Sequence, residues 1–211
     1  MQEIVNEITK RKKTGIRLIV CIFGSPGSGK STFAENLHNE LKKTHGLKSE
    51  IVPMDGFHFD NEILAARGLL GFKGSPATFD TDGFISLISK LRQQPETDQA
   101  IPIFDRELDL SRGSARLIEK STNILLIEGN YLMLDQAPWN YLQTFFDLTI
   151  KIVSDQKTLK ERLLRRWLDL GVSKERAFEK IKLNDLPNSD IVENLSIPAD
   201  LYVQSTLQKP S

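Results

Sequence analysis

The sequence is poor in cysteine, and this excludes the class of small proteins that disulfides stabilise. A single cysteine, Cys21, occurs among 211 residues, so no disulfide can form within the chain. Cys21 lies in an apolar run, where a free thiol behaves as a small hydrophobic side chain. We therefore expect a protein of the reducing cytoplasm.

An excess of charge of either sign is also missing. Lys plus Arg and Asp plus Glu both total 28, so the overall charge favours neither nucleic acid nor an anionic membrane as a partner. Any cationic binding site must therefore be local. We expect a small-molecule partner and no nucleic acid, and the sequence leaves the oligomeric state open, a homodimer included.

Long apolar runs are absent as well. No segment approaches the length that crosses a membrane, and residues 1–15 mix acidic and basic side chains where a signal peptide needs an unbroken apolar stretch. The hydrophobic share of 39% is enough for one good core in a chain of this length. We predict a single domain over residues 1–211, with no membrane as a partner.

The apolar residues that are present predict strands that alternate with helices. Residues 18–23 form a continuous β-branched and aromatic run, which is typical of a strand buried on both faces. Residues 55–80 contain four Gly residues and one Pro, and they predict a long functional loop. The alternation predicts an α/β fold with a mostly parallel five-stranded sheet and helices on both faces. We expect further strands at 51–52, 101–104, 124–127, 148–153 and 201–203, and helices at 4–13, 30–44, 61–67, 81–91, 138–146, 155–170 and 173–183.

The segment between the first predicted strand and the following helix matches the phosphate-binding pattern G-x-x-x-x-G-K-[ST] in full. Its glycines let successive backbone N–H groups turn inward around a phosphate, and the helix N-terminus adds the positive end of its dipole. Lys30 is expected to reach the β- and γ-phosphate oxygens, and the Ser31 hydroxyl to bind Mg²⁺. The predicted nucleotide-binding residues are Gly24, Ser25, Pro26, Gly27, Ser28, Gly29, Lys30, Ser31 and Thr32.

Two acidic residues follow predicted strands. Asp55 comes shortly after the strand at 51–52, and the carboxyl ends of strands in an open α/β sheet face the ligand crevice, so Asp55 is our candidate general base. Glu128 ends the apolar strand 124–127 and is expected to hold the metal or a metal-bound water. The alternatives are a turn-capping role for Asp55 before Gly56 and a merely solvated Glu128.

With these residues in place, the chain resembles the P-loop kinase family that contains uridine kinase, phosphoribulokinase and bacterial pantothenate kinase. The resemblance covers most of the chain, and several segments look most like pantothenate kinase. It implies Lys30 and Asp55 as catalytic residues, Ser31 and Glu128 as metal ligands, and ATP with Mg²⁺. The segments that carry it are the phosphate-binding pattern, 55–57, 67–70, 73–76, 79–80 and 124–129.

The resemblance also implies a small helical lid over about residues 155–185. In this family an arginine of the lid helix stabilises the charge of the transferred phosphoryl group, a task that suits a planar guanidinium. Arg162 and Arg166 are the two candidates, and a solvated helix face is the alternative for some of the arginines there. Asn188, in the segment 184–188, is placed with the nucleotide-binding residues.

The resemblance changes at the expected acceptor site. Where pantothenate kinase carries Tyr-Ser-His, residues 103–107 read Ile-Phe-Asp-Arg-Glu, and this segment with 184–188 is closer to a branch described as fructose-transport-system-kinase-like or nucleoside/nucleotide-kinase-like. We therefore predict His58, Asp105 and Arg106 as acceptor-binding residues. The alternatives are a packed histidine, and Asp105 paired with Arg106 on a surface loop.

These patterns together predict a kinase that transfers the γ-phosphate of ATP to a hydroxyl group of a sugar, nucleoside or pantothenate-like molecule. GTP as the donor is left open. The first alternative is a P-loop NTPase with a regulatory or assembly role and no small-molecule acceptor. The second is a nucleotide-binding module with little chemistry, against which the intact set of Lys30, Ser31, Asp55 and Glu128 argues.

Overall fold

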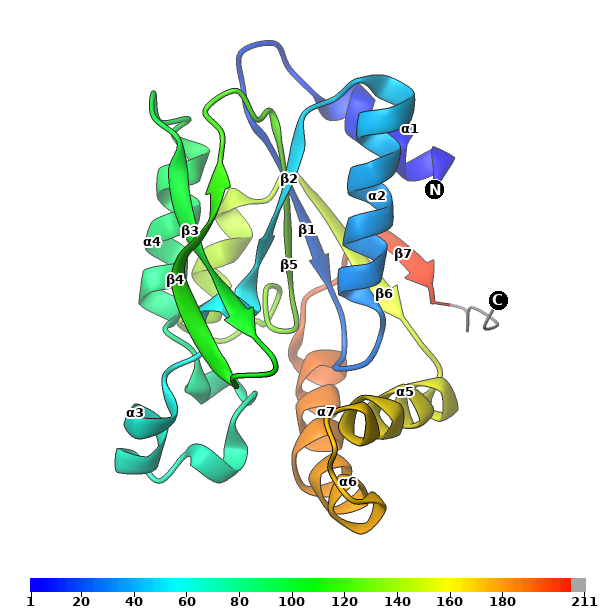
Figure 1. The fold of residues 1–211 in the computed structure, drawn as a ribbon. Coiled ribbons are helices and arrows are strands. Elements are labelled where there is room, and N and C mark those ends of the chain that lie inside the picture. The colour runs from blue at the N-terminus through cyan, green and yellow to red at the C-terminus, as the bar shows by residue number, and fades with distance from the viewer. Residues whose placement is uncertain (206–211) are drawn as a thin grey trace.

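The computed structural model describes residues 1–205, and its centre is a five-stranded sheet (Figure 1). All neighbouring strands in the order β2-β5-β1-β6-β7 pair in parallel, which confirms the predicted α/β fold. No helix in this part of the chain is both long and apolar enough to cross a membrane. The strands are β1 (Leu18–Phe23), β2 (Ser49–Pro53), β5 (Ile124–Gly129), β6 (Leu148–Val153) and β7 (Leu201–Gln204).

Helices cover both faces of the sheet and form two hydrophobic cores. One core packs α1 (Gln2–Arg11) and α2 (Lys30–His45) against the sheet. The other packs α4 (Thr81–Arg92), the 3₁₀ segment η4 (Trp139–Phe145) and α7 (Leu186–Leu195) against the opposite face. Every residue of the central strands β1 and β5 is buried, which explains the apolar runs 18–23 and 124–127.

The register of the central strands brings three chain segments to one edge of the sheet. Phe23 at the end of β1 lies opposite Gly129 at the end of β5, and Pro53 at the end of β2 lies opposite Glu128. Because parallel strands point the same way, the segments that follow them start side by side. This arrangement places the phosphate-binding loop, Asp55 and Glu128 together.

A β-hairpin beside the sheet was only partly predicted. It consists of β3 (Gln99–Asp105) and β4 (Leu110–Ile118), which pair antiparallel (Figure 1). The sequence indicated a strand over 101–104 but no partner for it. Most of β4 is exposed, so its sequence lacks the alternation that marks a half-buried strand. Pro102 lies where the register shifts, a position at which a missing N–H is tolerated.

The C-terminal helical region continues further than predicted. After α5 (Gln156–Asp169) and α6 (Lys174–Lys180), a π-helical turn (Ile181–Asp185) leads directly into α7. The predicted helix end at Leu183 was therefore wrong. Pro187 lies in the first turn of α7, a position at which helices tolerate proline.

The other helical predictions agree with the structure in place, if not always in type. The short helix α3 (Asn61–Ala66) lies in the long loop, which also contains the 3₁₀ segments η1 (Met54–Phe57), η2 (Leu70–Phe72) and η3 (Pro76–Thr78). The predicted helix at 138–146 is the 3₁₀ segment η4.

Candidate functional site

The loop between β1 and α2 has the backbone that its glycines allow. Gly29, which precedes α2, has φ +93°, a conformation that L side chains rarely adopt. A Cβ atom at Gly24 would lie 2.4 Å from the carbonyl oxygen of Ile152, so this position also excludes a side chain. Arg162 supports the loop, since its Nη1 donates to the Ser28 carbonyl at 3.0 Å and to the Ser205 hydroxyl at 2.7 Å.

A cavity of about 250 Å³ opens on this loop. Lys30, which is 8% exposed, donates from Nζ to the Ser25 carbonyl at 3.1 Å, and burial lowers its pKa to about 8. A buried cation at the N-terminus of α2 suits an anionic ligand. The cavity is lined by Pro26, Gly27, Gly29, Lys30, Ser31, Thr32, Asp55, Arg106, Glu128, Asn130 and Arg166.

Two oxygen groups that could bind a cation, the Ser31 hydroxyl and the Glu128 carboxylate, lie side by side in this cavity. The Ser31 hydroxyl donates to Glu128 Oε2 at 3.2 Å. Burial, followed by the charge of Asp55, raises the pKa of Glu128 to about 7. No group of three or more His, Cys, Asp or Glu side chains that could hold a metal occurs among residues 1–205. One hydroxyl and one carboxylate nevertheless suit Mg²⁺, which is commonly held by few protein ligands together with water and substrate phosphates.

A second cavity of about 770 Å³ adjoins the first. Five residues line both cavities, namely Pro26, Asp55, Arg106, Asn130 and Arg166. Asp55 lies in η1 directly after β2, and its Oδ2 is paired with Arg106 Nη2 at 3.1 Å. The junction of the cavities therefore holds a carboxylate that is 29% exposed, with one arginine beside it.

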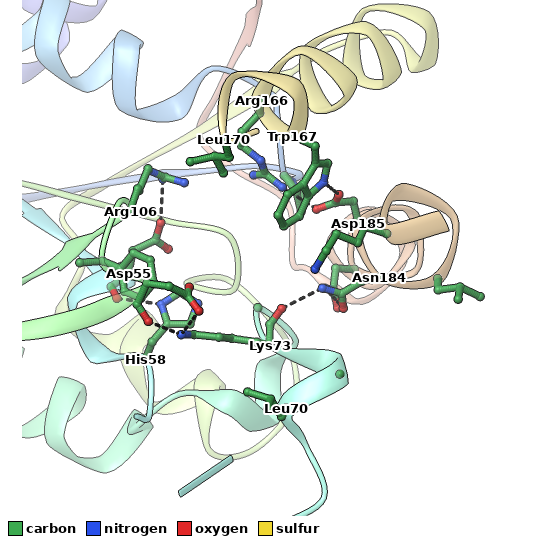
Figure 2. A pocket seen from close by; sticks show the side chains of 18 of the residues that line it. Asp55, His58, Leu70, Lys73, Arg106, Arg166, Trp167, Leu170, Asn184 and Asp185 are labelled. Carbon is green, nitrogen blue, oxygen red and sulfur yellow. Dashed lines mark hydrogen bonds and ion pairs between the residues drawn. The ribbon is translucent and has the colours of Figure 1, made fainter. Parts of the chain in front are cut away.

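His58 lies in the larger cavity, one helical turn after Asp55 (Figure 2). Its Nδ1 is 2.8 Å from the Asp55 carbonyl oxygen, and because a carbonyl only accepts, Nδ1 carries the hydrogen. Burial lowers the pKa of His58, which favours the neutral ring with a lone pair on Nε2. The imidazole packs against the rings of Phe79 and Phe104, whose centroids lie 4.1 and 4.6 Å from its own centroid.

Lys73 joins several elements around the larger cavity. Its Nζ donates to Asn61 Oδ1 at 2.7 Å and lies 3.0 Å from Asp109 Oδ2, and Asn184 Nδ2 donates to the Lys73 carbonyl at 2.8 Å (Figure 2). Asp185 pairs with Arg166 in the same region. Sequence reasoning selected Arg166 but did not select its partner Asp185, nor Lys73 and Asn184, although positions 73 and 184–185 lie in segments that carried the family resemblance.

Most of the predicted nucleotide-site residues gather as expected, with some exceptions. Arg166 lines both cavities, whereas Arg162 contacts the phosphate-binding loop and lines neither. The Ser25 hydroxyl points to Glu193 of α7, to which it donates at 2.7 Å. Asn188 lines the larger cavity, as Pro26 and Arg166 do, and does not line the smaller one.

Asp105 is not brought into the site. Its Oδ1 accepts hydrogen bonds from the backbone N–H groups of Glu107 and Leu108, and its Oδ2 pairs with Arg112 at 3.2 Å. It therefore stabilises the hairpin turn. The prediction of Asp105 as an acceptor-binding residue was wrong, because its carboxylate is used within the hairpin. The alternative pairing of Asp105 with Arg106 is not seen either, because Arg106 reaches Asp55.

Comparison with known proteins gives matches over almost the whole chain. Residues 19–208 match the sequence profile of the phosphoribulokinase/uridine kinase family. A Schizosaccharomyces pombe protein described as a candidate uridine kinase is 30% identical over 96% of this chain and 89% of its own length. The pantothenate kinase of Listeria monocytogenes is 30% identical over 82% of this chain, but the match spans only 56% of that enzyme.

A solved structure shares both the fold and part of the sequence. A protein from Silicibacter, described as a candidate fructose transport system kinase, superposes with a TM-score of 0.89. The two are 37% identical, and the match covers 95% of this chain and 97% of the other.

Proposed function

The chain belongs to the phosphoribulokinase/uridine kinase family, and on this premise we propose that it transfers the γ-phosphate of ATP to a hydroxyl group of a small molecule. One observation carries the proposal. Asp55 lines both the cavity at the phosphate-binding loop and the larger cavity beside it. A carboxylate at such a junction can face the phosphate donor on one side and the hydroxyl acceptor on the other.

The donor side of the proposal depends on the smaller cavity. Lys30 and the backbone N–H groups of the loop contact the β- and γ-phosphates of ATP. Ser31 and Glu128 would hold Mg²⁺, which when bound offsets phosphate charge. Arg166 is the arginine of the proposed lid, residues 155–185, because it lines both cavities while Arg162 lines neither.

In the proposed reaction the acceptor hydroxyl oxygen attacks the γ-phosphorus. The bond between that phosphorus and the β,γ-bridging oxygen breaks, and ADP leaves with the bonding electrons. The hydroxyl proton passes to the Asp55 carboxylate, which acts as general base. Lys30 and Arg166 stabilise the charge on the transferred group.

We propose a polyhydroxylated acceptor, such as a sugar or nucleoside. His58 Nε2 is an acceptor beside Asp55, so it suits a second hydroxyl of the ligand better than a carboxylate. Arg106 and Asn184 add donors around the same cavity. A ligand without matching hydroxyls would leave these polar groups unpaired and would be selected against.

The test is ADP release from MgATP in the presence of ribose, fructose, uridine or pantothenate. We expect a hydroxyl-rich acceptor to stimulate release and to be recovered with one added phosphate. The Asp55→Asn variant should bind ATP normally and lose at least ~10²-fold in turnover, as is usual for a positioned general base. Asp82→Asn, which changes an exposed carboxylate on α4, is the matched control.

Three outcomes would count against the proposal. Efficient, selective use of pantothenate would overturn the polyhydroxylated acceptor. Full transfer by Asp55→Asn would return Asp55 to a turn-capping role. ATP hydrolysis that none of a wide set of acceptors stimulates would favour the NTPase alternative.

A further inference from the structure

A buried carboxylate lies on the far wall of the larger cavity. Asp185 ends the π-helical turn before α7 and is 4% exposed. Its Oδ1 accepts from Arg166 Nη2 at 2.7 Å, and its Oδ2 accepts from Trp167 Nε1 at 2.7 Å. Both oxygens therefore accept hydrogen bonds from side chains of α5, and Figure 2 shows the bond from Trp167. Aspartate is rarely buried without such partners, so the position of this side chain is well defined.

The same turn contacts the opposite wall of the cavity. Asn184, the residue before Asp185, donates to the Lys73 carbonyl of the long loop at 2.8 Å. A π-helical turn contains one residue more than an α-helical turn, and such turns are frequent at functional sites. Here the turn lets two consecutive side chains reach two different elements.

Arg166 would be poorly fixed without this carboxylate. It belongs to α5 and lines both cavities, and its side chain is 31% exposed. Its guanidinium carbon lies 5.1 Å from the centre of the Trp167 ring, which Asp185 also holds. Arg166 Nε is buried and has no hydrogen-bond partner among residues 1–205, so one donor of the guanidinium is unsatisfied.

We propose that Asp185 is a positioning residue, which fixes the Arg166 guanidinium at the junction of the two cavities so that it contacts the phosphoryl group during transfer. The inference rests on the proposed function and adds a residue to it. Asp185 acts through Arg166 and does not itself contact ATP or the acceptor.

The central experiment is a double-mutant cycle on MgATP turnover, measured as ADP release without an acceptor and with the best acceptor of the panel. We expect Asp185→Asn to lower kcat by about 10- to 100-fold, the scale of a misplaced catalytic contact, while the KM for ATP stays nearly constant. In the Arg166→Ala background Asp185→Asn should cause no further loss, because the residue through which it acts is gone.

A binding measurement separates positioning from a general structural effect. Asp185→Asn should weaken the binding of MgADP with aluminium fluoride, which mimics the transferring phosphoryl group, and should leave MgADP binding unchanged. Asp169→Asn is the matched control. It removes an aspartate of the same helix that pairs with Arg165 at 3.8 Å and is 71% exposed, and kcat should not change.

Additive losses in the cycle, or a wild-type kcat for a folded Asp185→Asn protein, would overturn the assignment while the proposed kinase function stands. If Asp185→Asn does not fold, Asp185→Glu replaces it, because this change keeps the charge but moves the carboxylate away from the positions where it meets Arg166 and Trp167. An unaltered kcat in that variant would likewise overturn the assignment. If the wild-type protein turns over no ATP under any condition, the proposed function fails and this inference fails with it.

Discussion

At the scale of single residues, Lys30 shows the conflict between stability and ligand binding. Its ammonium group is almost fully buried, and desolvation lowers its pKa to about 8. Lys30→Ala should therefore lower ATP turnover steeply, by about 10²-fold or more, because a preorganised cation at the phosphates is lost. The thermal unfolding temperature of Lys30→Ala should fall by no more than that of a surface variant, because the change also removes a buried, poorly solvated charge.

Kinetics of ADP release and a thermal melt test this prediction, with Lys90→Ala on the exposed side of α4 as the control. Ser31→Ala should in addition raise the Mg²⁺ concentration needed for half-maximal activity. Near wild-type turnover by Lys30→Ala would contradict the assignment of the phosphate site.

Glu128 predicts a pH-dependent stability. Its pKa is about 7 in the folded protein against an ordinary 4.5, so the folded state binds the proton more tightly. The stabilisation from this group is complete below pH 4.5 and is lost as the pH rises through 7. Glu128→Gln cannot ionise. It should exceed wild type in stability at pH 8 by on the order of 1 kcal/mol, about 2–4 °C, and match it near pH 4.

Thermal melts at the two pH values measure this difference, and activity should fall in the same variant. Glu175→Gln changes an exposed glutamate of α6 and should shift neither melt. An equal shift at both pH values would show that the burial of Glu128 is not the cause.

At the scale of elements, the hairpin β3–β4 and the segment η1 lie in close contact at Gly56. A Cβ atom on Gly56 would meet the Pro102 carbonyl oxygen at 2.4 Å, and the Ser111 hydroxyl donates to the Gly56 carbonyl. Gly56→Ala should therefore push the hairpin away from Asp55, with a loss of roughly 1–3 kcal/mol from overpacking. Activity should fall too, because the hairpin carries Arg106.

Gly113 gives a matched control within the same hairpin. A Cβ atom there meets nothing within 4 Å, so Gly113→Ala should leave stability and kcat close to wild type. Urea unfolding and ADP release measure both variants. Equal behaviour of the two alanine variants would show that the close approach at Gly56 has no energetic weight.

At the scale of the whole molecule, Asp147 connects elements from both faces of the sheet. Its carboxylate accepts a hydrogen bond from Arg92 Nη2 of α4 at 2.8 Å. It also accepts one from the backbone N–H of Ile19 in β1 at 2.8 Å. Its carbonyl accepts from Arg11 of α1. Asp147→Ala would remove the carboxylate that accepts from Arg92 and from the Ile19 N–H, and should lower the free energy of unfolding by about 1–3 kcal/mol.

Asp169→Ala removes an exposed pair and should change the free energy of unfolding by less than about 0.5 kcal/mol. Urea denaturation of both variants measures the difference. A loss in Asp147→Ala as small as in Asp169→Ala would mean that solvent satisfies the donors that Asp147 now binds.

The sequence by itself determined the central sheet and the phosphate-binding loop. β1 and β6 have the predicted bounds. β1 is buried on both faces and is therefore an unbroken apolar run, whereas β6 alternates buried with half-buried residues. Gly29 and Gly24 mark the loop because its backbone excludes side chains, which is a local requirement. Asp55 and Glu128 were found for a similar reason, because each follows a recognisable strand.

Only the tertiary structure decided the walls of the larger cavity. β4 is mostly exposed, so no periodic pattern in the sequence marked it. Without β4 the hairpin was not predicted, and the hydrogen bond from the Glu107 N–H to Asp105 in its turn could not be predicted either. Asn184 binds Lys73, which lies 111 residues earlier in the sequence, and Asp185 binds Arg166, which lies 19 residues earlier. Such contacts form only when the chain folds, because polar side chains at a cavity follow the positions of distant elements and not a local period.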